Sequence, residues 1–199
     1  DGPLPAGIPM LPEKVTKEGL SEILESSQDF ILGLEREAVV PASFSFERPI
    51  LIASDSPAFV TNYYKLLEYH LERMSGKYNT LILDPSQRIS NQLFDGIQRF
   101  DTSLEVDNVM KTILEDFKKR VATPSQDYPK WLILIPDIAA TAMAAGMNEV
   151  DFKELLTEGS RYGVTLVFAG AYQDLVTNQY DNFVKLVNQL VEQVFLGVR

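Results

Sequence analysis

The chain has 199 residues, enough for one domain with a substantial core, and 45% of them are apolar, the balance of an ordinary globular protein. Its formal net charge of −10 disfavours binding to polyanions, so DNA and RNA are not expected partners. The sequence has no cysteine, which excludes disulfides, thiolate nucleophiles and cysteine-ligated zinc, and its single histidine, His70, argues against Ser-His-Asp catalysis. No apolar run approaches the ~20 residues needed to span a bilayer, and no signal peptide is evident.

The first part of the chain predicts a linker. Pro3, Pro5, Pro9 and Pro12 favour an extended backbone over a packed element. We therefore expect an interdomain linker or arm at residues 1–15 and a single domain at residues 16–199. Because the sequence begins with Asp1 and not with methionine, we expect it to be excised from a longer protein.

The expected domain alternates apolar runs with amphipathic patterns. It opens with a helix at 16–27 and short strands at 30–34 and 39–46. Runs of almost only apolar residues then predict buried strands at 49–53, 79–83, 131–135 and 164–169, with a last strand at 194–198. Helical periodicity is expected at 58–75, 102–122, 148–162 and 178–191. Such alternation is typical of an α/β fold with a mostly parallel sheet and helices on both faces.

The carboxyl ends of these strands mark the expected site, because ligands of an open parallel sheet bind beside them. Those ends carry Ser54, Asp84, Asp137 and Gly170, which we expect on one common edge. Two readings of the acidic residues stay open. Either they line a site, or Asp84 and Asp137 only cap helices and turns.

The segment after the first buried strand can be compared with a phosphate-binding P-loop. A working loop reads G-x-x-x-x-G-K-[ST], in which glycines bring backbone N–H groups to the phosphates, Lys neutralises them and the hydroxyl holds Mg²⁺. The same positions here read Ser54-Asp55-Ser56-Pro57-Ala58-Phe59-Val60-Thr61. Both glycines are missing, Val60 replaces the lysine, Asp55 adds negative charge, and only Thr61 fits. We therefore expect no cofactor, with ATP and Mg²⁺ bound only if the atypical loop accepts them.

The run at 131–135 takes the place of the metal-side strand of such ATPases. In a working site an apolar strand ends in an Asp that supports Mg²⁺, often followed by a catalytic Glu. Here Pro136 stands at the metal position and Asp137 at the position of the Glu. A shift of one residue would bring Asp137 to the metal position, so that alternative stays open.

Taken in order, these segments resemble the FtsK/SpoIIIE-type ATPase domains over nearly the whole chain. Residues 8–12 are similar to the Leu-Pro linker that joins such domains in tandem, and residues 30–35 to their early strand with a Gly-Leu turn. Residues 49–61 and 131–137 match the two nucleotide motifs in degenerate form, and residues 154–169 resemble the turn and strand that follow. A Gln commonly follows that strand in the family, whereas Gln173 lies two residues beyond this position. The resemblance implies a RecA-like, P-loop NTPase fold.

Within that family, the chain most resembles the terminal, degenerate ATPase-like domain of the membrane-anchored coupling ATPases of type VII protein secretion. The resemblance implies a cytoplasmic domain at the cell membrane, next to the preceding ATPase domains of the same chain. It also implies recognition of secreted WXG-type helical-hairpin proteins. A homo-oligomer of the full-length protein is a further partner that this resemblance leaves open.

Our leading hypothesis is a domain that binds protein and is not itself an enzyme. Phe59 and Val60, together with Met143 and Met147, are expected to make the old nucleotide crevice an apolar groove for a partner helix. The alternative is that these residues only fill the core. One rival function is a regulatory ATP-binding domain with weak hydrolysis, acting through the degenerate site residues Ser54, Asp55, Ser56, Thr61 and Asp137. A DNA translocase motor is disfavoured by the acidic charge and the missing lysine, and an unrelated α/β scaffold protein is the last alternative.

Overall fold

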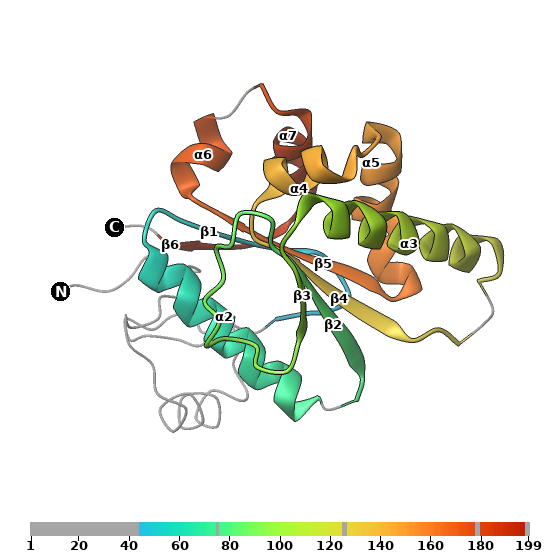
Figure 1. The fold of residues 1–199 in the computed structure, drawn as a ribbon, viewed down its shortest axis with the longest axis horizontal. Coiled ribbons are helices and arrows are strands. Elements are labelled where there is room, and N and C mark those ends of the chain that lie inside the picture. The colour runs from blue at the N-terminus through green and yellow to red at the C-terminus, as the bar shows by residue number, and fades with distance from the viewer. Residues whose placement is uncertain (1–43, 75, 125–126, 178–179, 198–199) are drawn as a thin grey trace.

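A six-stranded parallel sheet lies at the centre of the structure, a computed structural model that describes residues 44–197 apart from 75, 125–126 and 178–179. The strand order is β3-β2-β4-β5-β1-β6. The strands are β1 (Ile50–Ser54), β2 (Tyr78–Leu83), β3 (Gln98–Phe100), β4 (Lys130–Ile135), β5 (Val164–Gly170) and β6 (Gln193–Gly197). Helices cover both faces of this sheet (Figure 1), so the expected fold class is confirmed.

The four expected buried strands are adjacent and parallel. β1 pairs with β5, β5 with β4, and β4 with β2, in registers such as Ile50 opposite Val167 and Ile133 opposite Leu166. β1, β5 and the carboxyl ends of β2 and β4 are buried on both faces because helices or connections cover each face, which explains the apolar residues there. The predicted parallel sheet is therefore confirmed.

One face of the sheet is covered mainly by α2 (Pro57–Arg73), and we call it the α2 face. The helix begins at Ser56, whose hydroxyl accepts the N–H of Phe59, and Pro57 occupies its first turn, where a missing N–H does no harm. The connection between β2 and β3 adds Ile89, Leu93 and Phe94 to the same core. Residues 44–46 complete the cover, with Phe46 only 6% exposed.

The opposite face carries the remaining helices, and we call it the α3 face (Figure 1). They are α3 (Ser103–Ala122), α4 (Ile138–Ala145), α5 (Glu149–Glu158), α6 (Tyr172–Thr177) and α7 (Asn182–Leu190), with a 3-10 turn at Gly159–Tyr162. At the start of α3, Thr102 accepts the N–H of Glu105, and its hydroxyl also donates to the Glu105 carboxylate. This reciprocal contact is a capping box, in which a Thr caps the helix start and a Glu three residues later binds back to it.

Some expectations differ from the structure or lie outside it. The linker at 1–15, the helix at 16–27 and the strand at 30–34 lie outside the described residues. Of the strand expected at 39–46, only residues 44–46 are described, and they form no strand, although Phe44 and Phe46 pack onto the α2 face. β3 was not predicted from the sequence, and the helix expected at 178–191 begins only at Asn182, after the Asp181 cap, and ends at Leu190.

Candidate functional site

The carboxyl edge of the sheet brings the expected site residues together. β1, β2, β4 and β5 run parallel, so Ser54, Asp84, Asp137 and Gly170 all lie at this edge. A cavity of about 370 Å³ opens there between the end of β5 and the starts of α4 and α6. Asp137, Arg88 and Gly170 are among its lining residues. The predicted position of the site is therefore the position of a real cavity.

The connection that corresponds to the P-loop is too short to surround a phosphate. β1 ends at Ser54 and α2 begins at Pro57, so only Asp55 and Ser56 lie between them. The Ser56 N–H donates to the Ser54 hydroxyl at 2.9 Å. The N–H groups of Phe59 and Val60 donate to the Ser56 carbonyl at 3.1 and 3.3 Å. The backbone donors that would bind phosphate in a working loop are thus used within the helix start.

Phe59 and Val60 belong to the core of the α2 face. Phe59 is 6% exposed, and its ring lies 4.7 Å from the ring of Tyr63, measured between centroids. The same ring covers Gly197 of β6, where an added Cβ would come within 2.6 Å of the Phe59 Cγ. Val60 is half-buried against the same core, and Thr61 is half-buried one residue further along the helix. Phe59 and Val60 therefore belong to the core under α2, and none of these three side chains lines the 370 Å³ cavity.

The four residues expected to form one partner groove do not lie together. Phe59 and Val60 pack on the α2 face, whereas α4, with Met143, packs on the α3 face. Met143 is 81% exposed, and Met147 is half-buried against the α3-face core. The expected single groove is wrong in this respect, because the sheet itself separates its two halves. A partner contact at Met143 stays a prediction.

Asp137 is fully engaged by neighbouring groups. One carboxylate oxygen accepts the Ala140 N–H at 3.1 Å and so caps α4. The other accepts the Ser86 hydroxyl at 2.6 Å and pairs with the Arg88 guanidinium at 3.2 Å. Arg88 also approaches the carbonyl of Pro136 at 3.5 Å. Asp137, expected at the position of the catalytic Glu or, after a shift of one residue, at the metal position, therefore already has a cation from its own chain.

The position of Arg88 is set by the connection after β2. The buried Asp84 carboxylate accepts the N–H groups of Arg88 and Ile89 at 2.8 and 2.9 Å. Asp84 thus caps this turn, which was one of the two readings of the sequence. Tyr64 of α2 lies under the turn: burial raises the pKa of its phenol, the Asp84 charge raises that pKa further, and the Arg88 charge lowers it.

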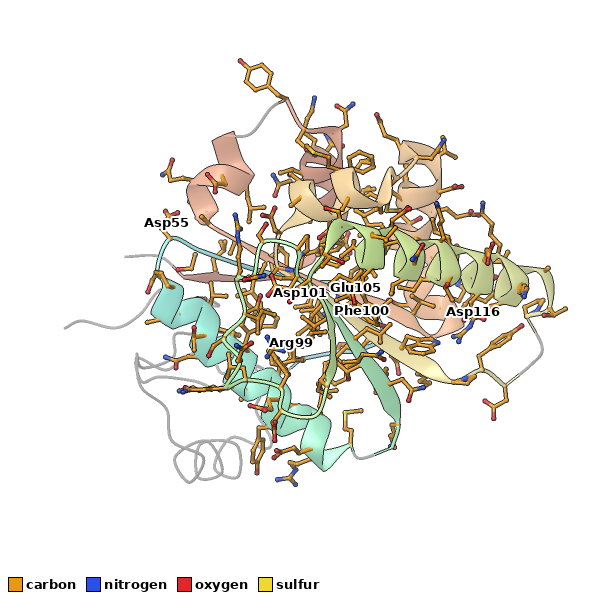
Figure 2. All side chains as sticks on the ribbon, viewed as in Figure 1. Asp55, Arg99, Phe100, Asp101, Glu105 and Asp116 are labelled. Atoms are coloured by element: carbon orange, nitrogen blue, oxygen red, sulfur yellow. The ribbon has the colours of Figure 1, made fainter. Side chains whose placement is uncertain are left out.

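Asp55 is a further charged group at this edge, exposed in the connection between β1 and α2 (Figure 2). Its carboxylate accepts the N–H of Gln173, in the first turn of α6, at 3.0 Å. Asp55 therefore binds a backbone donor of the loop after β5, and it adds a negative charge where phosphate would have to approach. Sequence reasoning had no signal for this contact, because the two residues lie 118 positions apart.

Taken together, these residues do not fit Mg²⁺ and a nucleotide. The connection after β1 offers no free ring of backbone donors, and the acid at the end of β4 is paired with Arg88. Across residues 44–197, leaving out the gaps at 75, 125–126 and 178–179, no cluster of three or more His, Asp or Glu side chains could hold a metal ion. No chemical step that requires a bound nucleotide follows from this geometry.

A second, larger cavity lies away from this edge. It runs beside α3 toward the starts of β4 and β5, and its volume is about 570 Å³. Figure 2 labels two of its lining residues, Phe100 at the end of β3 and Asp116 on α3. We call it the α3 groove, and its apolar lining consists of Leu81, Phe100, Val109, Ile113, Tyr128, Pro129, Trp131 and Val164.

Arg120 closes the far end of the α3 groove. Its side chain is buried, donates to the Tyr162 carbonyl at 2.8 Å and pairs with Asp116 at 2.9 Å. The Tyr128 ring lies 5.0 Å from its guanidinium carbon. These contacts fix the groove wall, and none of its residues was predicted as a site. The available signal was Trp131, a large aromatic residue at the start of an expected strand, which the structure shows half-buried against the α3-face core.

Comparison with known proteins connects this fold to protein secretion. No family model matches the sequence. The type VII secretion system protein EssC of Staphylococcus aureus strain MSSA476 is 22% identical over 204 residues, which cover 100% of this chain. The S. aureus strain NCTC 8325 protein of the same name is also 22% identical, over 203 residues. The chain is homologous to EssC over its whole length.

The matched region is a small part of EssC, since the chain spans 14% of the length of that relative. Solved structures of EssC and EccC share the fold. EccC of Thermomonospora curvata, ATPases 2 and 3 in complex with a signal sequence peptide, superposes with a TM-score of 0.68 at 15% identity, covering 94% of this chain and 37% of that one. The cytoplasmic domain of EssC superposes with a TM-score of 0.59 at 16% identity, covering 96% and 41%.

The solved structures show which proteins share this architecture. The mostly parallel sheet with helices on both faces is the P-loop ATPase fold of the EssC and EccC ATPase domains. In the part of the chain that the structure describes, no helix is long and apolar enough to cross a membrane.

Proposed function

We propose that this chain is a non-catalytic, ATPase-like domain of a type VII secretion ATPase, and that it binds a segment of a secreted protein. The observation that carries the first half is the connection between β1 and α2, which consists of Asp55 and Ser56 alone. A P-loop needs a longer, glycine-containing turn and a lysine to wrap and neutralise phosphates. The Asp137–Arg88 pair supports the same reading, because it opposes a Mg²⁺ ion at the neighbouring position.

Calorimetry with Mg-ATP tests the non-catalytic half. We expect no binding tighter than roughly millimolar, a level at which binding contributes about 4 kcal/mol. The same titration on a catalytic domain of a type VII secretion ATPase serves as the positive control. A micromolar dissociation constant for this chain would overturn the proposal in favour of a regulatory ATP-binding domain.

The α3 groove is the surface that we assign to the secreted protein. Its apolar floor lies beside an exposed helix, an arrangement that suits an amphipathic segment laid along α3. The EccC structure with a signal sequence peptide supports a peptide-binding role for domains of this fold. From the homology to EssC we further propose WXG-type helical-hairpin proteins as the substrate class. We propose the adjoining ATPase domains as further partners. The proposed location is the cytosolic face of the membrane.

The only tryptophan of the chain, Trp131, lies in this groove, so its fluorescence reports on binding there. We expect synthetic peptides from secreted helical-hairpin proteins to shift Trp131 emission, whereas scrambled peptides do not. Thr112→Arg should block the groove and weaken binding at least about tenfold, because a charge and a long side chain would occupy the apolar space.

Thr157→Arg is the matched control. Thr112 and Thr157 are both exposed helix residues whose hydroxyls donate to the carbonyl one turn before them, but Thr157 on α5 does not line the groove. We expect this variant to bind like the unmodified chain. Equal binding by the Thr112→Arg variant would place the secreted protein on another surface.

A further inference from the structure

The carboxyl edge is crossed by two contacts between charged groups and distant loops. The Asp55 carboxylate accepts the Gln173 N–H at 3.0 Å and so joins the end of β1 to α6. The Arg88 guanidinium pairs with Asp137 at 3.2 Å and joins the connection after β2 to the end of β4. Between them the contacts tie together the ends of four parallel strands, β1, β2, β4 and β5.

The signs of these charges correspond to the two charges of a magnesium nucleotide. In a working P-loop site, an anionic phosphate accepts backbone N–H groups and a cation sits near the acid that follows the metal-side strand. Here a carboxylate accepts the backbone N–H, and a guanidinium neutralises the acid after β4. Each group comes from the chain itself, from a loop that faces its partner across the edge.

We propose that Asp55, facing the α6 amide of Gln173, and Arg88, facing Asp137, replace the phosphate and the metal ion and hold the strand ends at the carboxyl edge together without any ligand. The inference rests on the proposed non-catalytic role, and it adds which contacts stabilise the carboxyl edge of the sheet. The first pair is a charge-assisted hydrogen bond, which is the stronger kind, and the second is an ion pair. The Ser86 hydroxyl on Asp137 and the Asp84 carboxylate on the Arg88 and Ile89 amides keep the second pair in place.

Amide hydrogen exchange measured by NMR tests the proposal directly, because the amide of Gln173 is itself one half of a contact. In the unmodified chain we expect the Gln173 and Ile89 amides to exchange slowly, and 5 mM Mg-ATP to leave their rates unchanged. Asp55→Ala should speed exchange at Gln173, and Arg88→Met at Ile89, each by roughly five- to tenfold, because local opening is no longer opposed by the hydrogen bond or by the ion pair.

Two control variants match the changes in charge. Lys111→Met removes a cation from an exposed ion pair with Asp107 on α3, and Asp95→Ala removes an exposed acid from the connection after β2. We expect neither to alter the Gln173 or Ile89 rates. The Leu134 amide of β4, read in the same spectra, distinguishes local opening from global unfolding. If Arg88→Met speeds Leu134 as well, Ser86→Ala takes its place, since it removes only the hydroxyl bond to Asp137.

The outcomes separate this inference from the proposed function. Rates in the Asp55→Ala and Arg88→Met variants that equal those of the controls would overturn it, even if calorimetry shows no nucleotide binding. Slower exchange of the unmodified edge on addition of Mg-ATP would overturn it as well. Faster local exchange in both variants supports it, and tight Mg-ATP binding in calorimetry would count against the proposed function alone.

Discussion

Tyr63 carries a hydroxyl group into the core of the α2 face. The residue is 0% exposed, its ring packs against Phe59 and Phe195, and its hydroxyl has no hydrogen-bond partner among the described residues. Burial raises the pKa of this phenol above its ordinary value, because the charged form loses solvation. The neutral phenol therefore supports the fold fully below the ordinary tyrosine pKa of about 10, and this contribution is lost as pH rises toward the raised value.

Tyr63→Phe should accordingly cost little at neutral pH and help at alkaline pH. We expect the free energy of unfolding at pH 7 to change by at most about 1 kcal/mol, because no hydrogen bond to a described residue is lost. Above about pH 10 the variant should lose stability less steeply than the unmodified chain, although Tyr64 keeps part of the slope. Urea unfolding at pH 7 and above about pH 10 measures the free energy of unfolding. Tyr180→Phe serves as the control, because Tyr180 is 96% exposed. If the free energy of unfolding of the Tyr63→Phe variant falls as steeply with pH as that of the unmodified chain, another group causes the pH dependence.

The residue scale also shows which parts of the site a sequence can predict. The sequence itself shows that lysine and both glycines are missing between Ser54 and Thr61. It also offered a capping role for Asp137, because a helix cap depends only on residues close in sequence. The partners Arg88 and Gln173 were not predictable. Ser86 and Asp137 lie 51 positions apart and Asp55 and Gln173 lie 118 apart, so only the folded sheet edge brings them together.

At the scale of elements, burial on both faces made the central strands easy to predict. β1, β4 and β5 are runs of buried apolar residues, and each was expected within a few positions of its observed bounds. β3 was missed because it is short, at the sheet edge, and reads Gln-Arg-Phe. Its register comes from pairing with β2, which leaves no periodic signal in the sequence. The hydrophobic pattern of the sequence therefore did not predict β3, which forms through its pairing with β2.

At the scale of the whole molecule, charge is the property with the clearest consequence. The chain carries a formal net charge of −10, and the basic side chains near its candidate edge are engaged, Arg88 by Asp137 and Arg99 by the carbonyls of Ile89 and Ser90. Binding to duplex DNA depends on cations that displace counterions from phosphates. We expect no gel shift of duplex DNA at micromolar protein and physiological salt. A shift that weakens as salt rises would reveal a local basic surface that overrides the net charge.

The position of β1 within the sheet has a consequence for how the chain folds during synthesis. β1 lies between β5 and β6, yet it is made before either of them. Until residues 164–197 leave the ribosome, both edges of this apolar strand lack their partners, and pairing must then close loops that contain most of the domain. The nascent domain therefore carries an exposed, aggregation-prone strand while residues 55–163 are made, and folding of the domain should be late, cooperative and sensitive to chaperones.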